Sequence, residues 1–150
     1  MTKQIRDQAR RAALRVLYAA DVADDDTDEV LDNARQALIE QGEDPSEYWD
    51  PVVGRVRAVL DDQERIDAEI RALSTSWRLE RMAAVDRNLL RLGIFELLEG
   101  LAPPLVTINA CVELAKEFGT ASTPGFINGL LDQLCQDHDI PLKSADRRSD

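Results

Sequence analysis

The sequence predicts an all-α fold, a single compact domain of six or seven helices built as two three-helix bundles that share a core. Apolar residues recur at helical spacing along the chain, and no segment shows the alternation typical of a strand. Only 7 glycines and 6 prolines interrupt the 150 residues. The stretch 82–98 is apolar around nearly its whole helical circumference, which favours a place at the centre of a bundle.

The first two helices are marked by their apolar stripes and their ends. An apolar stripe runs from Ile5 to Ala20, and three consecutive aspartates at 24–26 end the first helix. Either Asp26 or Thr27 can cap the second helix, because both side chains accept a hydrogen bond from a free backbone N–H group. Gly42 is expected to end it.

The middle of the chain predicts a third helix and the central one. In the third helix, Asp50 is expected to be the N-cap and Pro51 the first helical residue. The apolar pattern of this helix continues through Leu73, with a kink near 61–62. Residues 74–76 form a connector. The central helix over 82–98 is expected to end at Gly100.

Two further helices complete the domain. Thr107 is expected to cap a helix that runs through Phe118. Ser122 or Thr123, followed by Pro124, opens a last helix that ends near residue 136. The domain is therefore expected to span 1–136, with 137–150 as a polar tail that frays.

Composition excludes several classes of protein. The chain has 29 acidic and 18 basic residues, a net charge of −11, which argues against indiscriminate binding of nucleic acid. Two cysteines are too few for a disulfide framework. With no signal peptide and no apolar run of about 20 residues, a cytoplasmic protein without a membrane segment is expected.

The charge is unevenly distributed along the chain. Residues 1–20 hold five basic residues and one acid, a net of +4, whereas residues 21–50 hold twelve acids and one arginine, a net of −11. The acidic total therefore hides a basic first helix. Lys3, Arg6, Arg10 and Arg11 on that helix could meet several phosphates, although such a face is more often only solvated.

Residues for catalysis or metal binding are not grouped in the sequence. The single histidine, His138, falls in the predicted tail and is expected to be solvated. Cys111 and Cys135 lie on separate helices and are expected to be small core residues. Asp86 starts the central helix, where a capping or solvent-facing acid is the simpler interpretation. We expect no enzyme activity, no metal and no cofactor.

Four motifs in order resemble the NusB family of transcription antitermination factors. They are ARRxALxxLY at 9–18, VDRxLLRLxxxEL at 85–97, PxVxINxxVELAKxFG at 104–119 and FINGLLD at 126–132. The segment 21–75 contributes little to the likeness. The resemblance implies two three-helix bundles and a non-catalytic factor that pairs with the ribosomal protein NusE. It also implies binding of boxA RNA in nascent transcripts, including ribosomal RNA, within the antitermination complex on RNA polymerase.

The resemblance also assigns roles to individual residues. Arg6 and Arg10 fall on the family's arginine-rich RNA-binding helix, and Phe126 matches an aromatic position near bound RNA. Phe126 also shares a stripe with apolar residues of the last helix, so a core position is an equal alternative. Tyr18 and Asp86 match positions that face the ribosomal protein.

Two alternative functions remain open at this stage. One is a helical protein–protein module, or a homodimer that masks its basic helix and binds no RNA directly. The other is an enzyme, because the same helical domain begins the ribosomal RNA cytosine methyltransferases, but 150 residues leave no room for a methyltransferase fold. The sequence therefore favours the RNA-binding factor over both alternatives.

Overall fold

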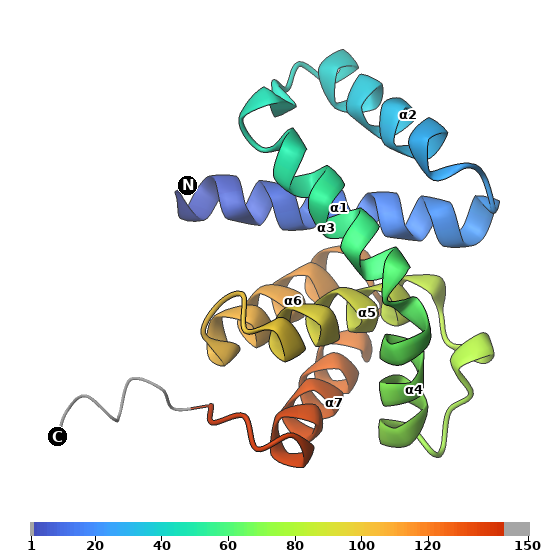
Figure 1. Cartoon of the computed structure of the whole chain (residues 1–150), viewed down its shortest axis with the longest axis vertical. Helices are drawn as coiled ribbons and strands as arrows, with labels where there is room; N and C mark the ends of the chain where they lie inside the picture. The colour runs from blue at the N-terminus through green and yellow to red at the C-terminus, as the bar shows by residue number, and fades with distance from the viewer. Residues whose placement is uncertain (1, 143–150) are drawn as a thin grey trace, which may run out of the picture. The chain divides into compact units, whose positions relative to one another are not determined.

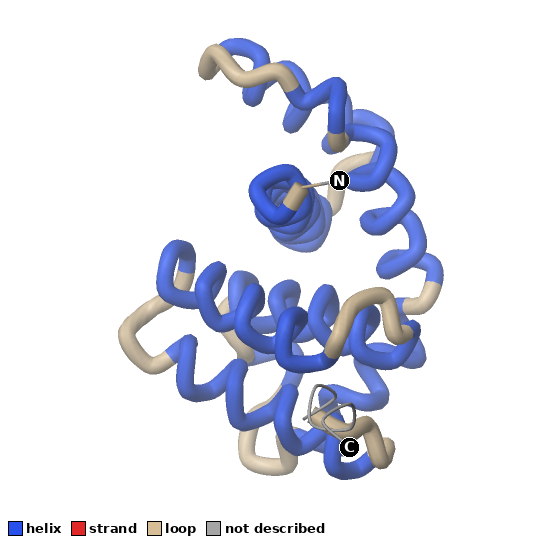
Figure 2. The backbone as a smooth tube through the Cα atoms, turned by 90° about the vertical axis from the view of Figure 1, so that its left-hand side faces the viewer, coloured by secondary structure: helices blue, strands red, loops and turns tan. Residues whose placement is uncertain are grey.

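The structure is a computed structural model that describes residues 2–142, and each regular element in that range is a helix (Figures 1 and 2). The described residues form seven α-helices and two short 3-10 helices. The α-helices are α1 (Lys3–Ala23), α2 (Thr27–Glu40), α3 (Trp49–Asp61), α4 (Gln63–Leu73), α5 (Ala84–Glu99), α6 (Pro104–Phe118) and α7 (Thr123–Asp137). The 3-10 helices are η1 (Pro45–Glu47) and η2 (Leu79–Arg81). The all-α prediction is confirmed.

The chain divides into two units, residues 1–62 and residues 63–150. In the first unit α1 packs against both α2 and α3, and in the second unit α5 packs against α4, α6 and α7. The first unit has the three helices expected. The second has four rather than three, because the helix predicted to kink near 61–62 ends at Asp61 and a separate helix begins at Gln63.

The ends of α1 and α2 follow the predicted signals. Asp24 ends α1 in the left-handed conformation, with φ 55°. Asp26, rather than Thr27, caps α2, because its carboxylate accepts a hydrogen bond from the Glu29 N–H at 3.3 Å. Gly42, with φ 87°, follows this helix and supplies the positive φ that other residues adopt at a cost.

Two predicted helix starts are wrong by a few residues. Helix α3 begins at Trp49, so Pro51 lies third in the helix rather than first, where its missing N–H would also have had no intrahelical partner. Helix α6 begins at Pro104 rather than after Thr107. Thr107 is fully buried inside α6, where its hydroxyl donates to Glu96 of α5 at 3.4 Å.

The central helix α5 is buried along ten consecutive residues, from Asn88 to Leu97. Because it contacts three other helices of its unit, it has no solvent-facing side over that length. Gly93 lets two of these helices come close, since a Cβ atom there would lie 3.0 Å from Leu131 and 3.1 Å from the Cys111 sulfur. Both cysteines are buried, as predicted.

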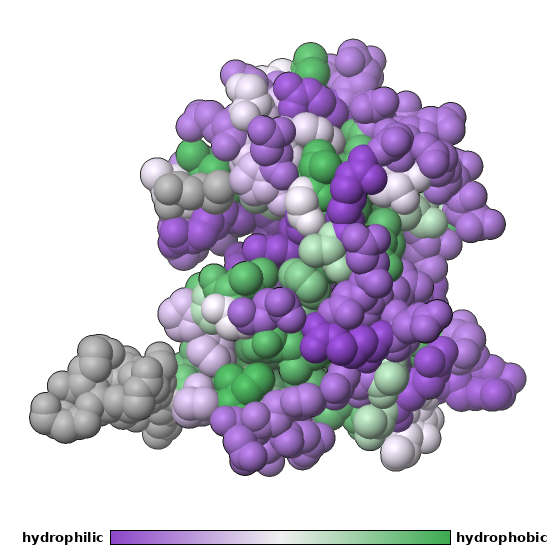
Figure 3. All heavy atoms as spheres, viewed as in Figure 1, coloured by the Kyte–Doolittle hydropathy of each residue, from purple (hydrophilic) through white to green (hydrophobic). Residues whose placement is uncertain are grey.

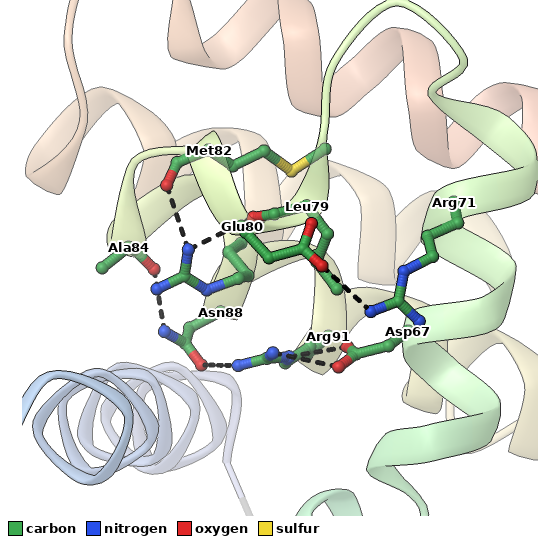
Figure 4. Close-up of polar contacts among 9 residues, drawn as sticks. Asp67, Arg71, Leu79, Glu80, Met82, Ala84, Asn88 and Arg91 are labelled. Atoms are coloured by element: carbon green, nitrogen blue, oxygen red, sulfur yellow. Dashed lines mark hydrogen bonds and ion pairs between the residues drawn. The ribbon is translucent and has the colours of Figure 1, made fainter. Parts of the chain in front are cut away.

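A buried ion pair joins α4 to α5 (Figure 4). The Arg91 guanidinium donates through Nε to one Asp67 oxygen at 2.8 Å and through Nη2 to the other at 3.1 Å. Its Nη1 donates to the Asn88 side chain at 3.2 Å, and the Asn88 amide donates in turn to the Ala84 carbonyl at 2.8 Å. The side chains of Arg91 and Asp67 are only 7% and 10% exposed. Because little water reaches them, each charge is stabilised mainly by the other.

Some large apolar side chains remain at the surface of the second unit. Figure 3 shows hydrophobic residues reaching the surface in the region where Figure 1 places α5 and α6. Leu101, Leu105 and Val106 are each between 42% and 48% exposed at the α5–α6 connection. Among the described residues, no helix combines the length and the apolar character that a membrane crossing requires.

Removing the carboxylate of Asp67 should destabilise the protein strongly. The substitution Asp67→Ala leaves the Arg91 guanidinium buried without its partner, and breaking such a pair costs about 3–5 kcal/mol of unfolding free energy. Urea unfolding followed by circular dichroism measures the loss. Arg71→Ala removes an exposed ion pair with Glu80 and should change stability little. Equal stability of Asp67→Ala and the parent chain would contradict this account of the core.

Candidate nucleic-acid interface

The N-terminal half of α1 gathers positive charge at the positive end of a helix dipole. Thr2 caps the helix by accepting a hydrogen bond from the Ile5 N–H at 3.2 Å, and the first turn contains no acidic residue. Lys3 and Arg6 therefore add to the partial charge of the free N–H groups instead of neutralising it. This arrangement costs helix stability and favours an approaching anion such as phosphate.

Asp7 partly offsets this charge. Its carboxylate lies 2.9 Å from the Lys3 Nζ and 3.8 Å from the Arg10 Nη1. The Lys3 side chain is 84% exposed, so its pair with Asp7 is weak and an RNA phosphate can compete for the ammonium group. Lys3 and Arg6 are exposed, whereas Arg11 is half-buried.

Arg10 differs from the exposed Lys3 and Arg6, because its side chain is only 10% exposed. Seven residues make about two helical turns, so Arg10 projects from the same side of α1 as Leu17, which is buried. The same spacing places Arg11 on the side of Tyr18, which is 40% exposed. The spacing predicted that Arg6 and Arg10 share a face outside the core stripe, with Arg11 alongside, but it did not indicate that Arg10 is largely covered.

Tyr18 belongs to an exposed face of α1 that also contains an apolar side chain. Val22, one turn further along, is 58% exposed, and Arg15 on the same face is exposed as well. An exposed tyrosine beside an aliphatic residue is a combination common in protein–protein contacts. The face therefore fits the predicted partner-binding role of Tyr18 in its chemistry.

A groove between α1 and α2 was missed by sequence analysis. It has a volume of about 160 Å³ and is lined by Arg11 and Arg15 of α1, Leu38 of α2 and Tyr48, among other residues. The Tyr48 hydroxyl donates to Glu43 at 3.3 Å. Burial, followed by the nearby charge of Glu43, raises the pKa of Tyr48, so the phenol stays protonated at neutral pH. No sequence signal marked Tyr48, because its burial is a tertiary effect.

Phe126 lies in the first turns of α7 and is half-buried. Its ring packs edge-to-face against Trp77, with the centroids 6.4 Å apart and an interplanar angle of 76°. The neighbouring Ile127 is fully buried, so the core side of α7 passes beside Phe126. The structure thus places Phe126 between the two predicted alternatives, neither in the fully buried core nor wholly in solvent.

Asp86 is tied to another helix of its own unit. One of its oxygens accepts a hydrogen bond from the Thr123 hydroxyl at 3.0 Å, and that hydroxyl accepts one from the Thr120 N–H at 3.0 Å. Only glycine fits at position 119 without a steric clash, because a Cβ atom there would lie 2.6 Å from the Thr123 side chain. Asp86 therefore joins the start of α5 to the start of α7, in addition to any role toward a partner.

Cys135 and His138, two residues with side chains that could take part in catalysis, have environments that suit a structural role. Burial, followed by the charge of Asp132, raises the pKa of the Cys135 thiol to about 11, so the reactive thiolate is scarce at neutral pH. His138 was expected to be solvated, but its Nε2 lies 2.8 Å from the Glu69 carboxylate, where it links α7 to α4. Residues 143–150 of the predicted tail lie outside the described range.

Comparison with known proteins gives a consistent match. The model of the NusB family matches residues 7–136. The transcription antitermination protein NusB of Anaeromyxobacter dehalogenans strain 2CP-1 is 42% identical over 131 residues, which cover 86% of this chain and 89% of that protein. The protein of the same description from Myxococcus xanthus is 39% identical over 130 residues, covering 86% and 93%.

Solved structures show the same fold. NusB of T. maritima is 28% identical and superposes with a TM-score of 0.76, covering 88% of this chain and 91% of the other. A crystal structure of the antitermination factors NusB and NusE in complex with dsRNA contains a chain that is 24% identical, with a TM-score of 0.78 and coverage of 91% and 99%. From the match over residues 7–136 and the 42% identical relative, the chain belongs to the NusB family.

Proposed function

We propose that this chain is a non-catalytic transcription antitermination factor that binds boxA-type RNA in nascent transcripts, including those of ribosomal RNA. The observation that carries the proposal is the family match over residues 7–136, with relatives about 40% identical that are described as transcription antitermination proteins. The chain acts in the cytoplasm, within the antitermination complex on RNA polymerase. The exposed cations of α1 and the exposed ring of Tyr18 support this proposal.

The proposed RNA contacts begin at the N-terminal end of α1. Lys3 and Arg6 supply exposed charges at the positive end of the helix dipole, and Arg11 extends the charge by about one turn. The Arg10 side chain is only 10% exposed, so we assign it a smaller share of direct phosphate contact than Lys3 and Arg6. Phe126 supplies an aromatic ring for an unpaired base.

The proposed protein partner is the small-subunit ribosomal protein NusE. A chain of the same fold occurs in the structure of NusB and NusE with dsRNA, which supports a pairing of this kind. Tyr18 offers an exposed ring and hydroxyl to the partner, and Asp86 is the second predicted contact. Because Asp86 also holds Thr123, its replacement would disturb the fold as well as the contact.

Charge explains why this factor would need a partner to bind RNA selectively. Residues 21–50 carry a net charge of −11, which repels a polyanion from their own surface. The +4 of residues 1–20 is a small charge for tight phosphate binding by itself. We expect the pair with NusE to bind boxA RNA better than either protein alone.

Reversing the charge of Arg6 should weaken RNA binding by the heterodimer. Arg6→Glu replaces an exposed cation near the helix terminus, and we expect roughly a tenfold loss of affinity for boxA RNA with a salt slope lower by about one. Fluorescence anisotropy over a range of salt concentrations measures both. Lys116→Glu is the matched control, because it makes the same change in net charge on an exposed residue of α6.

The comparison with a scrambled RNA decides whether binding is selective. Equal affinity of the heterodimer for boxA and scrambled RNA would contradict the proposed function. If Arg6→Glu and Lys116→Glu weaken binding equally, only the total charge matters and α1 is not the site. Retained RNA binding by a homodimer in sedimentation experiments would exclude the idea that self-association masks the basic helix.

Removing the ring of Tyr18 should weaken binding to NusE in the absence of RNA. Exposed tyrosines at interface centres often contribute strongly, so Tyr18→Ala is expected to lower the affinity for NusE about tenfold. Isothermal titration calorimetry with the two purified proteins measures this. Leu105→Ala, which truncates another exposed apolar residue, is the control. Unchanged affinity of Tyr18→Ala would remove this residue from the proposed interface.

A further inference from the structure

We propose that Trp77 is a stacking platform for an unpaired base of the bound RNA, and that it forms with Phe126 a two-ring aromatic step on the second unit. Trp77 lies in the connector between α4 and α5, outside the motifs that suggested RNA binding. This inference rests on the proposed function and extends its RNA contacts to a segment not assigned to them. The ligand is a base of single-stranded RNA, since a paired base offers no free face to a side chain.

The exposure of Trp77 is the first observation behind this inference. Its side chain is 60% exposed, whereas Trp49, the other tryptophan, is 9% exposed. Tryptophan is strongly buried on average, because its large apolar surface is unfavourable in water. The edge-to-face contact with Phe126 covers only part of the indole, so part of the ring surface remains exposed to a ligand.

The connector that presents Trp77 is fixed, although the ring itself is exposed. Leu79 and Met82, which follow Trp77, are buried at 4% and 8% exposure. The Arg87 guanidinium donates to the carbonyl of Leu79 at 3.2 Å and to that of Met82 at 3.1 Å (Figure 4). The connector is therefore held in place without the ligand, and a base that stacks on Trp77 loses little affinity to ordering the backbone.

Charge beside Trp77 favours a polyanion. Arg78 and Arg81 are exposed, and within residues 2–142 neither side chain forms a hydrogen bond or an ion pair. Glu80, the acid between them, is engaged by Arg71 at 3.5 Å (Figure 4). The first turn of α7, which carries Phe126, contains no acidic residue. Aromatic rings beside exposed arginines are the combination that proteins use for single-stranded nucleic acid.

Two substitutions separate stacking from packing at this position. Trp77→Leu keeps an apolar side chain against Phe126 but removes the aromatic face, whereas Trp77→Phe keeps a face. With the NusE heterodimer and boxA RNA, we expect Trp77→Leu to lower affinity about tenfold and Trp77→Phe to lower it less. Circular dichroism of both variants checks that they fold, and Leu105→Ala serves as the control for an exposed apolar residue of the same unit.

Fluorescence gives a second measurement on a chain with Trp77 intact. In a Trp49→Phe variant Trp77 is the single tryptophan, so its emission reports its own surroundings. Stacking on a base should quench this emission when boxA RNA is added to the heterodimer. Addition of NusE alone should leave most of the emission unchanged. Quenching by NusE alone, with no further change on RNA addition, would overturn the inference in favour of a protein contact.

The outcomes distinguish this inference from the proposed function. If the unmodified heterodimer prefers boxA RNA and Trp77→Leu binds it equally well, the inference is wrong and the function stands. If Trp77→Leu loses affinity for NusE without RNA, Trp77 contacts protein and the inference is also wrong. If the unmodified heterodimer shows no preference for boxA RNA, both fail together.

Discussion

The ion pair between Arg91 and Asp67 is the interaction on which the second unit depends. A charged residue in the middle of α5 is tolerated because Asp67 accepts two of its hydrogen bonds and Asn88 a third. The pair holds α4 against α5, and the connector that contains Trp77 runs between these two helices. The buried Arg91–Asp67 pair therefore helps to position the exposed connector that contains Trp77.

A second polar tie at the start of α5 serves the same unit. Asp86 holds Thr123, and Phe126 follows three residues later on α7. The two polar contacts therefore bring together the segments that carry Trp77 and Phe126, whose rings touch. Neither contact needs a ligand to form. A surface built in this way is preorganised, so the RNA contacts that we propose there would depend on side-chain chemistry more than on folding during binding.

In the first unit, positive and negative charge lie on different helices. Basic residues crowd the N-terminal half of α1, while α2 and its flanks hold most of the acidic excess of the chain. Of the acids in that region, Asp26 has a structural task as the cap of α2, and Asp28 pairs with Arg57 of α3. The net charge of −11 is therefore compatible with a local cationic site on α1, where we propose that RNA binds.

The fold was predictable from sequence because its signals are local. Apolar periodicity identified the helices, and Asp26 and Gly100 marked helix ends through their own side-chain or backbone chemistry. The start of α6 was misplaced, because Thr107 is a good capping residue whose hydroxyl instead bonds to Glu96 in the interior. Here tertiary packing overrode a local preference.

The candidate site was predictable only in part. Charge alone suggested Lys3 and Arg6, which the structure places in exposed positions, but the low exposure of Arg10 depends on the tertiary packing of α1. Trp77 lies in an irregular connector without periodicity, so no sequence pattern indicated that its ring would be exposed and would meet Phe126. Such long-range contacts depend on the fold rather than on neighbours in the sequence.

Photo-cross-linking tests the account most directly, because it maps RNA contacts on the intact complex. A boxA RNA with 4-thiouridine at successive positions is irradiated with the NusE heterodimer, and the modified peptides are identified by mass spectrometry. The account predicts cross-links in two segments, the N-terminal half of α1 and the residues around Trp77 and Phe126. Cross-links confined to α2 and α3, with neither segment modified, would contradict it.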